Sequence, residues 1–217
     1  MISKAFDGAL NGQENMDRDC ALLDLLSDHK AAYRVYSWDG PWISLGKFQK
    51  PEKALKEGCP APWVMRPTGG KAVLHGHDVT LGLAARLEAI GVQESRSVGP
   101  AYRQIVGPIV QAMKDGGARV ELAENTRFVR TAGHTADCFA HIAPNDIVDP
   151  MTGQKICGCA LKLTNDAVLV QASIPAGQPL VDPRLVFDAP HSGAICVGLE
   201  AQSFFQAMER AILSVLK

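Results

Sequence analysis

A very short connection joins two apolar segments in the second half of the chain. Residues 156–163 and 167–174 each have the composition of a strand, and only Thr164-Asn165-Asp166 lies between them. Asn and Asp adopt turn conformations readily, so this connection predicts a hairpin. Because hairpin strands pair antiparallel, part of the sheet in this protein is expected to be antiparallel.

Other segments predict a mixed fold. Further strands are expected at residues 31–38, 42–46, 63–66, 71–75, 119–122 and 146–148, and helices at residues 13–26, 51–58, 100–114 and 200–216. In the first helix, Asn15 or Asp17 can act as the N-cap, and the apolar side chains recur at helical spacing. Strands that look antiparallel, with helices set apart from them, favour the α+β class: mainly antiparallel sheets with flanking helices.

Size and charge narrow the possible functions. The chain has 217 residues, 47% of them hydrophobic, which suits a single domain over residues 1–217 with a sizeable core. Its formal net charge is -1, so a nucleic-acid partner is not expected, because phosphate binding needs clustered positive charge. No segment reaches the roughly 18 to 20 apolar residues of a membrane span. The N-terminus is too polar for a signal peptide, and we expect a cytoplasmic protein.

The six cysteines are expected to be free thiols rather than disulfides, because a chain of this size with a large core does not need cross-links. Cys157 and Cys159 are two residues apart, and no second pair completes a tetrahedral set, so no zinc or other metal site is predicted. These two cysteines are expected to share one face of their strand as packed thiols. The tryptophans are expected in the core or in a pocket wall: Trp38, Trp42 and Trp63.

The stretch RPTGGKAVLH, residues 66–75, places two adjacent glycines between two predicted strands. Glycines let the backbone pass close to a ligand, and the exposed N–H groups of such a turn can bind an anion. Arg66 and Lys71 flank the turn with positive charge. A carboxylate, phosphate or thioester oxygen could bind there, although a simple hairpin turn with incidental surface charge accounts for the same pattern.

Two further residues could carry chemistry. Lys155 begins a strand of apolar and small residues, where its ammonium could stabilise negative charge developing on an oxygen, or could simply be solvated. Cys138 lies in an irregular segment with His134 and His141 nearby in sequence. A nearby histidine or cation could give it the thiolate character of a nucleophile, although a loop cysteine is more often inert.

Taken in order, these segments resemble the lipoate-protein ligase and octanoyltransferase family, whose catalytic domain is similar to that of biotin protein ligases. The resemblance covers YRVYSWDGPWISLGKFQ at residues 33–49, RPTGGKAVLH, and Asp146 with the lysine block at residues 153–160. It implies that Gly69 and Gly70 line an acyl pocket and that Lys155 holds the reacting carbonyl. The further substrate-binding residues that it implies are Arg66, Thr68, Lys71, Ala72, Val73, His75, Asp146, Gly158 and Ala160.

The sequence departs from the family pattern in the expected pocket wall. Lys71 stands where a third glycine is common, Cys159 follows Gly158 where serine is usual, and the segment 169–174 lacks the family's histidine and glycine. An Asp146 carboxylate could hold either a backbone turn or a ligand. These differences leave open which acyl group and which acceptor the protein would use.

The resemblance allows two enzymatic mechanisms. A transferase would move an octanoyl or lipoyl group from an acyl carrier protein to Cys138, and then to a lysine of a lipoyl-domain acceptor, without a cofactor. A ligase would activate free lipoate with ATP and Mg²⁺, leaving Cys138 without a role. The accessory domain that often follows the ligase domain is expected to be absent, or to be a separate subunit. We favour the transferase; a non-catalytic acyl-binding protein is the third possibility.

Overall fold

The computed structural model describes residues 1–93, 98–128, 135–191 and 196–217. Within these residues the larger sheet has seven strands, and its order is β1-β2-β6-β10-β9-β8-β7. The first pair is parallel, and every other pair in this sheet is antiparallel. The strands span Ile2–Leu10 (β1), Ala31–Trp38 (β2), Asp78–Arg86 (β6), Glu121–Leu122 (β7), Ile147–Val148 (β8), Lys155–Leu163 (β9) and Ala167–Pro175 (β10).

A smaller sheet has the order β4-β3-β5, with strands Ile43–Leu45 (β3), Trp63–Met65 (β4) and Val73–Leu74 (β5). The central strand β3 pairs parallel with β4 and antiparallel with β5. The glycine stretch therefore does not close a hairpin. It crosses from one edge of this sheet to the other, past the end of β3.

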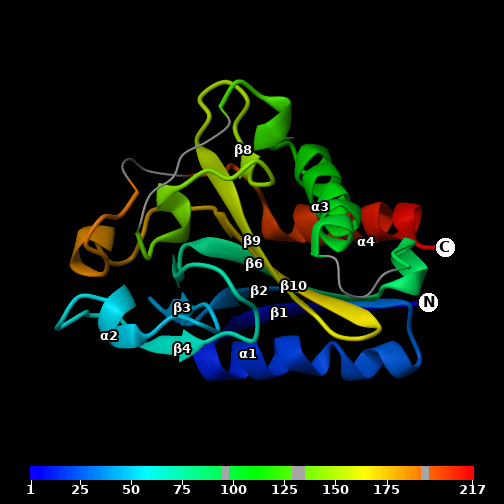
Figure 1. Ribbon diagram of the computed structural model, residues 1–217, viewed down its shortest axis with the longest axis horizontal. Coiled ribbons are helices and arrows are strands. Elements are labelled where there is room, and N and C mark those ends of the chain that lie inside the picture. Colours follow the sequence, from blue (N-terminus) through cyan, green and yellow to red (C-terminus); the bar gives the residue numbers. More distant parts are fainter. Residues whose placement is uncertain (94–97, 129–134, 192–195) are drawn as a thin grey trace.

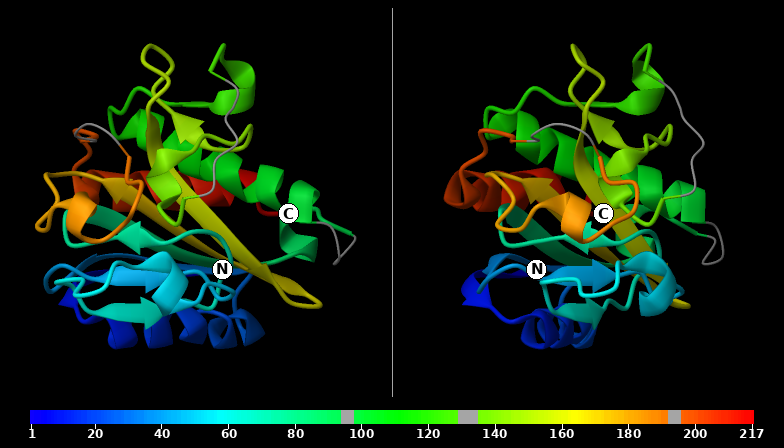
Figure 2. Two further views of the ribbon diagram at one scale, coloured as in Figure 1. Left: turned by 60° about the vertical axis from the view of Figure 1, so that its left-hand side comes forward. Right: turned by 90° about the vertical axis from the view of Figure 1, so that its left-hand side faces the viewer.

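The helices cover both faces of the larger sheet (Figures 1 and 2). On one face, α3 and α4 pack together over the main hydrophobic core, which includes Tyr33, Leu83 and Val170. On the other face lies α1, followed by the short helix η1, and beside it the smaller sheet. The helical bounds are Gly12–Ala21 (α1), Asp24–Ser27 (η1), Pro51–Ala54 (α2), Glu88–Ile90 (η2), Val98–Asp115 (α3), Ala123–Asn125 (η3), Cys138–Ala140 (η4), Pro183–Leu185 (η5) and Ala201–Val215 (α4).

The α+β class and the hairpin of β9 and β10 are confirmed by this architecture. The long first helix is wrong in its bounds, because α1 ends at Ala21 and a separate 3₁₀ turn follows. Its N-cap is Asn11, whose side chain accepts a hydrogen bond from the Glu14 N–H. Asn15 instead lies inside the helix, where its amide donates to the carbonyls of Leu10 and Ser37.

The sequence analysis missed two strands of the larger sheet, β1 and β6. The edge strand β1 alternates poorly and is mostly exposed, so it lacks the pattern of a half-buried strand. The central strand β6 has Gly82 at its middle, which weakens a strand signal. A Cβ at Gly82 would lie 2.3 Å from the Asp19 carboxylate, so the close approach of α1 requires glycine there.

None of the helices in the described part of the chain combines the length and the apolarity that crossing a membrane demands.

Candidate acyl-transfer site

The Cys138 thiol lies at the start of η4, in a segment that runs beside the glycine stretch. The Cys138 backbone N–H donates to the Ala72 carbonyl, and the Ala72 N–H donates to the Ala136 carbonyl. Asp137 caps η4 by accepting a hydrogen bond from the Phe139 N–H. The thiol also faces β9, because a Cβ built on Gly158 would stand 3.2 Å from the Cys138 Sγ atom. Glycine at 158 therefore leaves room for the sulfur.

Lys155 extends its ammonium to this thiol. Its Nζ atom lies 3.4 Å from Cys138 Sγ and 2.9 Å from Asp146 Oδ1, and its side chain is buried. Burial alone would lower the pKa of Lys155, but the nearby Cys138 and the Asp146 carboxylate outweigh it and hold the pKa well above its ordinary value. Lys155 therefore remains a cation beside the sulfur at neutral pH.

Asp146 holds a backbone turn, which is one of the two roles that the sequence left open, and it also forms an ion pair with Lys155. Its Oδ2 atom accepts a hydrogen bond of 2.6 Å from the Ala143 N–H, which closes a local turn. Its Oδ1 atom holds the Lys155 ammonium. The carboxylate thus fixes the position of the lysine rather than facing the open cavity.

Arg66 shapes the glycine stretch from inside. Its guanidinium donates to the carbonyls of Gly69 and Lys71 at 2.7 Å each and to the Ser44 carbonyl at 3.0 Å. Burial lowers the pKa of Arg66 to about 10, which still leaves it charged at neutral pH. Because the Arg66 guanidinium donates to carbonyls of the protein itself, its principal contacts fix the shape of the glycine stretch.

Two glycines are required by the packing of this loop. Gly70 has φ +93°, in the left-handed region, and a Cβ there would stand 3.0 Å from the Arg66 guanidinium. A Cβ at Gly46 would overlap the Gly70 carbonyl oxygen at 1.9 Å. Gly69 has no such restriction, since the nearest atom, on the Phe48 ring, would be 3.9 Å from its Cβ.

These loops enclose a cavity of about 420 Å³, its open mouth included, between the smaller sheet and the α1 face of the larger sheet. Eight of the residues implicated by sequence line it: Arg66, Gly70, Lys71, Val73, His75, Cys138, Gly158 and Ala160. Five do not: Thr68, Gly69, Ala72, Asp146 and Lys155. Of these five, Lys155 contacts the lining through Cys138, and Thr68 and Ala72 are buried in the loop.

Sequence analysis missed part of the opposite wall. The structure adds Met16 from α1, Tyr36 from β2, Ser44 from β3 and Thr80 from β6. Cys159, Gln171, Ala172 and Ser173 also line the cavity, and they come from the two segments that the sequence analysis had placed in the pocket wall. Strand pairing brings these residues together, as Ser173 pairs with both Thr80 and Gly158. No local motif marks the four missed residues, because the register between distant strands decides which residues meet.

The tryptophans take different positions. Trp38 is buried and lines the cavity, as expected, and Trp42 is partly buried against the cluster around Trp38. The expectation for Trp63 is wrong, because it is 47% exposed on β4. Cys157 and Cys159 are confirmed as neighbours on one face of β9, with 3.6 Å between their Sγ atoms.

His75 is held between two side chains at the cavity wall. Its Nε2 atom lies 2.7 Å from Ser44 Oγ, and its Nδ1 atom lies 2.7 Å from Asp78 Oδ2. The Trp38 ring stacks on the imidazole with 4.0 Å between centroids. Burial alone would raise the pKa of Asp78, but His75 and hydrogen bonds such as that from Ser173 lower it to about 2. The polar groups of this wall therefore bind one another, which suits a cavity for an apolar group.

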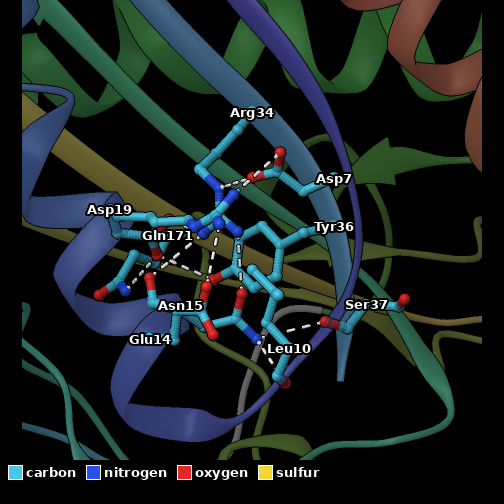
Figure 3. Close-up of polar contacts among 10 residues, drawn as sticks. Asp7, Leu10, Glu14, Asn15, Asp19, Arg34, Tyr36, Ser37 and Gln171 are labelled. Atoms are coloured by element: carbon cyan, nitrogen blue, oxygen red, sulfur yellow. Dashed lines mark hydrogen bonds and ion pairs between the residues drawn. The ribbon is translucent and has the colours of Figure 1, made fainter. Parts of the chain in front are cut away.

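A buried polar network supports the cavity from behind (Figure 3). Asp19 accepts hydrogen bonds from Arg34 at 2.8 Å, Tyr36 at 2.8 Å and Gln171 at 2.6 Å. Gln171 in turn accepts from the Thr68 hydroxyl at 2.7 Å. Gln171 thus connects α1 to the glycine stretch.

The sequence named His134 and His141 as neighbours of Cys138. His134 lies outside the described residues. A histidine that the structure does place at the cysteine segment is His191, whose Nδ1 atom is 2.7 Å from Asp137 Oδ2. Sequence analysis did not predict this contact because His191 and Asp137 are 54 residues apart in the chain.

Comparison with known proteins identifies the family of this chain. The family of the lipoyl protein ligase A/B catalytic domain matches residues 11–182. Octanoyltransferase LipM of Carboxydothermus hydrogenoformans is 31% identical over 172 residues, covering 76% of this chain and 61% of that protein. Octanoyltransferase LipM of Moorella thermoacetica is 35% identical over 149 residues, covering 65% of this chain and 52% of that protein. The chain thus spans little more than half the length of these curated relatives.

Solved structures share the fold. A putative lipoate protein ligase from T. acidophilum with bound lipoic acid superposes with a TM-score of 0.74 at 16% identity, covering 99% of this chain and 84% of that chain. A lipoate-protein ligase A bound with ATP gives a TM-score of 0.70 at 16% identity, with the same coverage. On the match over residues 11–182, the chain belongs to the family of lipoyl protein ligase A/B catalytic domains.

Proposed function

We propose that this protein is an acyltransferase that moves an octanoyl or lipoyl group from a carrier-protein thioester, through Cys138, to a lysine of a lipoyl-type acceptor domain. The observation that carries the proposal is the 3.4 Å contact between Lys155 Nζ and Cys138 Sγ at the wall of the cavity. A ligase would have no use for a nucleophilic sulfur at this point. The octanoyltransferase relatives, at about 30% identity, support the same choice.

In the first step, the Cys138 thiolate attacks the carbonyl carbon of the carrier thioester. The thiolate is the reactive form of cysteine, and the Lys155 ammonium lies beside this sulfur. The carbonyl oxygen gains negative charge in the tetrahedral intermediate, and the Lys155 ammonium, 3.4 Å from the reacting sulfur, can stabilise that charge. The carrier sulfur then leaves as a thiolate and takes a proton from solvent, while the acyl group remains on Cys138.

In the second step, a neutral lysine amine of the acceptor attacks the acyl-Cys138 carbonyl. The C–S bond breaks, an amide forms, and the amine proton passes to solvent. Cys138 leaves as a thiolate, which Lys155 again stabilises. Removing one such electrostatic contact costs about 3 to 4 kcal/mol in the transition state. Asp146 holds the ammonium in position through both steps.

The cavity supplies the site for the acyl chain. Its wall includes Met16, Trp38, Val73, Ala160 and Ala172. Each methylene of an acyl chain buried against such a wall contributes about 0.8 kcal/mol. Because His75, Ser44 and Asp78 bind one another, an alkyl chain leaves none of the three without its hydrogen bond.

Intact-mass measurement tests the proposal. Incubation with octanoyl-carrier protein and no ATP should add one octanoyl group to the wild-type chain and none to Cys138→Ser. A peptide map should place it on Cys138. An apo lipoyl domain added afterwards should remove it and gain the same mass on its lysine.

The other mechanisms give different results. Formation of an acyl-adenylate from free lipoate, ATP and Mg²⁺, undiminished in Cys138→Ser, would identify a ligase. Binding of the acyl group with turnover by neither route would identify a non-catalytic acyl-binding protein. Either result would refute the covalent transfer proposed here.

A further inference from the structure

A tight turn at residues 46–49, which we call the Phe48 turn, is hydrogen-bonded to the glycine stretch that contributes Gly70 and Lys71 to the cavity lining. The Gln49 N–H donates to the Gly46 carbonyl, and the Gln49 side chain accepts from the Gly46 N–H. The Lys47 N–H donates to the Thr68 carbonyl at 2.9 Å, which ties the turn to the glycine stretch. The Gln49 amide makes a long contact of 3.5 Å to the Ala136 carbonyl, two residues before Cys138.

The turn presents an aromatic side chain to solvent. Phe48 is 84% exposed, although its ring edge lies against Gly69. A single exposed apolar residue is ordinary in a protein. Phe48 differs in that hydrogen bonds of its neighbours Lys47 and Gln49 hold its turn in shape, so an aromatic group held in this way loses little conformational freedom when a partner packs on it.

The turn and the residues directly after it carry positive charge. Lys47, Lys50 and Lys53 are exposed within seven residues, and Glu52 is the acidic residue among them. The Lys47 ammonium lies 5.8 Å from the centre of the Phe48 ring. Lys71, which lines the cavity, adds a fourth cation in the glycine stretch to which the turn is hydrogen-bonded. A partner that packs on Phe48 would therefore be favoured by acidic groups around its contact surface.

We propose that the Phe48 turn is the docking site of the acceptor domain, with Phe48 as the apolar anchor and the lysines facing acidic residues beside the acceptor lysine. This inference rests on the proposed acyl transfer. A lysine side chain spans about 6 Å, since it has five bonds of about 1.5 Å at tetrahedral angles. The acceptor backbone must therefore come within about that distance of the acyl group on Cys138, and the Phe48 turn is hydrogen-bonded to the glycine stretch whose Gly70 and Lys71 line the cavity.

The body of the acyl donor does not need to come this close to the cavity. A thioester carried on a long flexible arm can enter the cavity while the body of its carrier stays farther away. Because the acyl group waits on Cys138 between the two steps, the donor leaves before the acceptor binds. The acceptor is accordingly the partner that the Phe48 turn is placed to contact.

The test separates docking from chemistry. Wild-type protein and Phe48→Ala are first loaded to octanoyl-Cys138 and purified. Transfer to an apo lipoyl domain is followed by mass spectrometry, in parallel with deacylation by hydroxylamine, which needs no docking. We expect Phe48→Ala to transfer to the domain about tenfold more slowly. Hydroxylamine deacylation should change by less than about twofold, as for other exposed positions.

Matched controls lie on the opposite side of the larger sheet. Leu213→Ala removes another exposed apolar side chain, on α4, and should leave both reactions unchanged. The double variant Lys47→Glu with Lys50→Glu should slow transfer to the domain and weaken its dependence on salt. Lys114→Glu, on α3, should do neither.

Several outcomes would overturn the inference. Unchanged transfer by Phe48→Ala would exclude the turn as a docking site. Slower loading from octanoyl-carrier protein with normal transfer to the domain would assign the turn to the donor instead. If Phe48→Ala slowed deacylation by hydroxylamine as much as transfer to the domain, the substitution would be acting on the chemistry inside the cavity and not on docking. If the wild-type protein does not load at Cys138, the proposed function fails before docking is tested.

Discussion

The Nζ atom of Lys155 lies between a sulfur and a carboxylate, 3.4 Å from Cys138 and 2.9 Å from Asp146. This arrangement keeps a buried lysine charged at neutral pH and positions that charge beside the nucleophile. A cation with only the thiol as partner would be free to move, whereas the carboxylate fixes its direction. The relationship makes the lysine the first position to test.

Lys155→Ala is expected to slow loading of Cys138 by about 100- to 1000-fold, because the developing negative charge loses its cation. Loading of octanoyl from its carrier protein, measured by quenched mass spectrometry, provides the rate. Lys162→Ala, later on the same strand, is the matched control and should load at the wild-type rate. Near-normal loading by Lys155→Ala would refute the assigned role.

Gly70→Ala is expected to destabilise the protein, because alanine at φ +93° is strained and its Cβ would press on the Arg66 guanidinium at 3.0 Å. The expected loss is about 1 to 2 kcal/mol in the free energy of unfolding. Gly69→Ala is the matched variant and should be close to neutral in stability, since its Cβ meets nothing nearer than 3.9 Å. Urea denaturation of both variants measures the difference. Equal losses would show that loop shape does not depend on the left-handed glycine.

The residues that sequence identified and those that it missed differ in how they reach the cavity. Gly70, Val73 and Cys138 lie in short segments whose composition marks them, and all three line the cavity. Thr80 was missed: it lies on β6, so only the register of β6 with its neighbours β2 and β10 brings it there. That register follows from packing over the whole sheet, including the missed strand β6. Local sequence patterns therefore cannot predict this register.

Asp78 should make stability depend on pH in the acid range. Its pKa is lowered to about 2 in the folded protein, so its contribution is complete above about pH 4 and is lost as the pH falls toward 2. Asp78→Asn removes this pH-dependent contribution to the free energy of unfolding. The difference in unfolding free energy between wild type and Asp78→Asn should therefore shrink by roughly 2 kcal/mol between pH 5 and pH 2. Urea denaturation over this range measures it. A difference that stays constant with pH would show that Asp78 is not held by His75 as described.

Thr68→Val tests the connection between the glycine stretch and the buried network. The Thr68 hydroxyl accepts from Arg66 Nε at 3.1 Å and donates to Gln171 Oε1 at 2.7 Å. Valine has nearly the same shape but can do neither, so a buried guanidinium and a buried amide each lose a partner. The expected cost is about 1 to 3 kcal/mol of unfolding free energy. Loading of Cys138 should slow as well, because Arg66 also holds the carbonyls of Gly69 and Lys71. Thr68→Ser keeps the hydroxyl and should recover most of the loading rate, since only a methyl group is lost. If serine and valine slow loading equally, the methyl contact rather than the hydrogen bonds positions the loop.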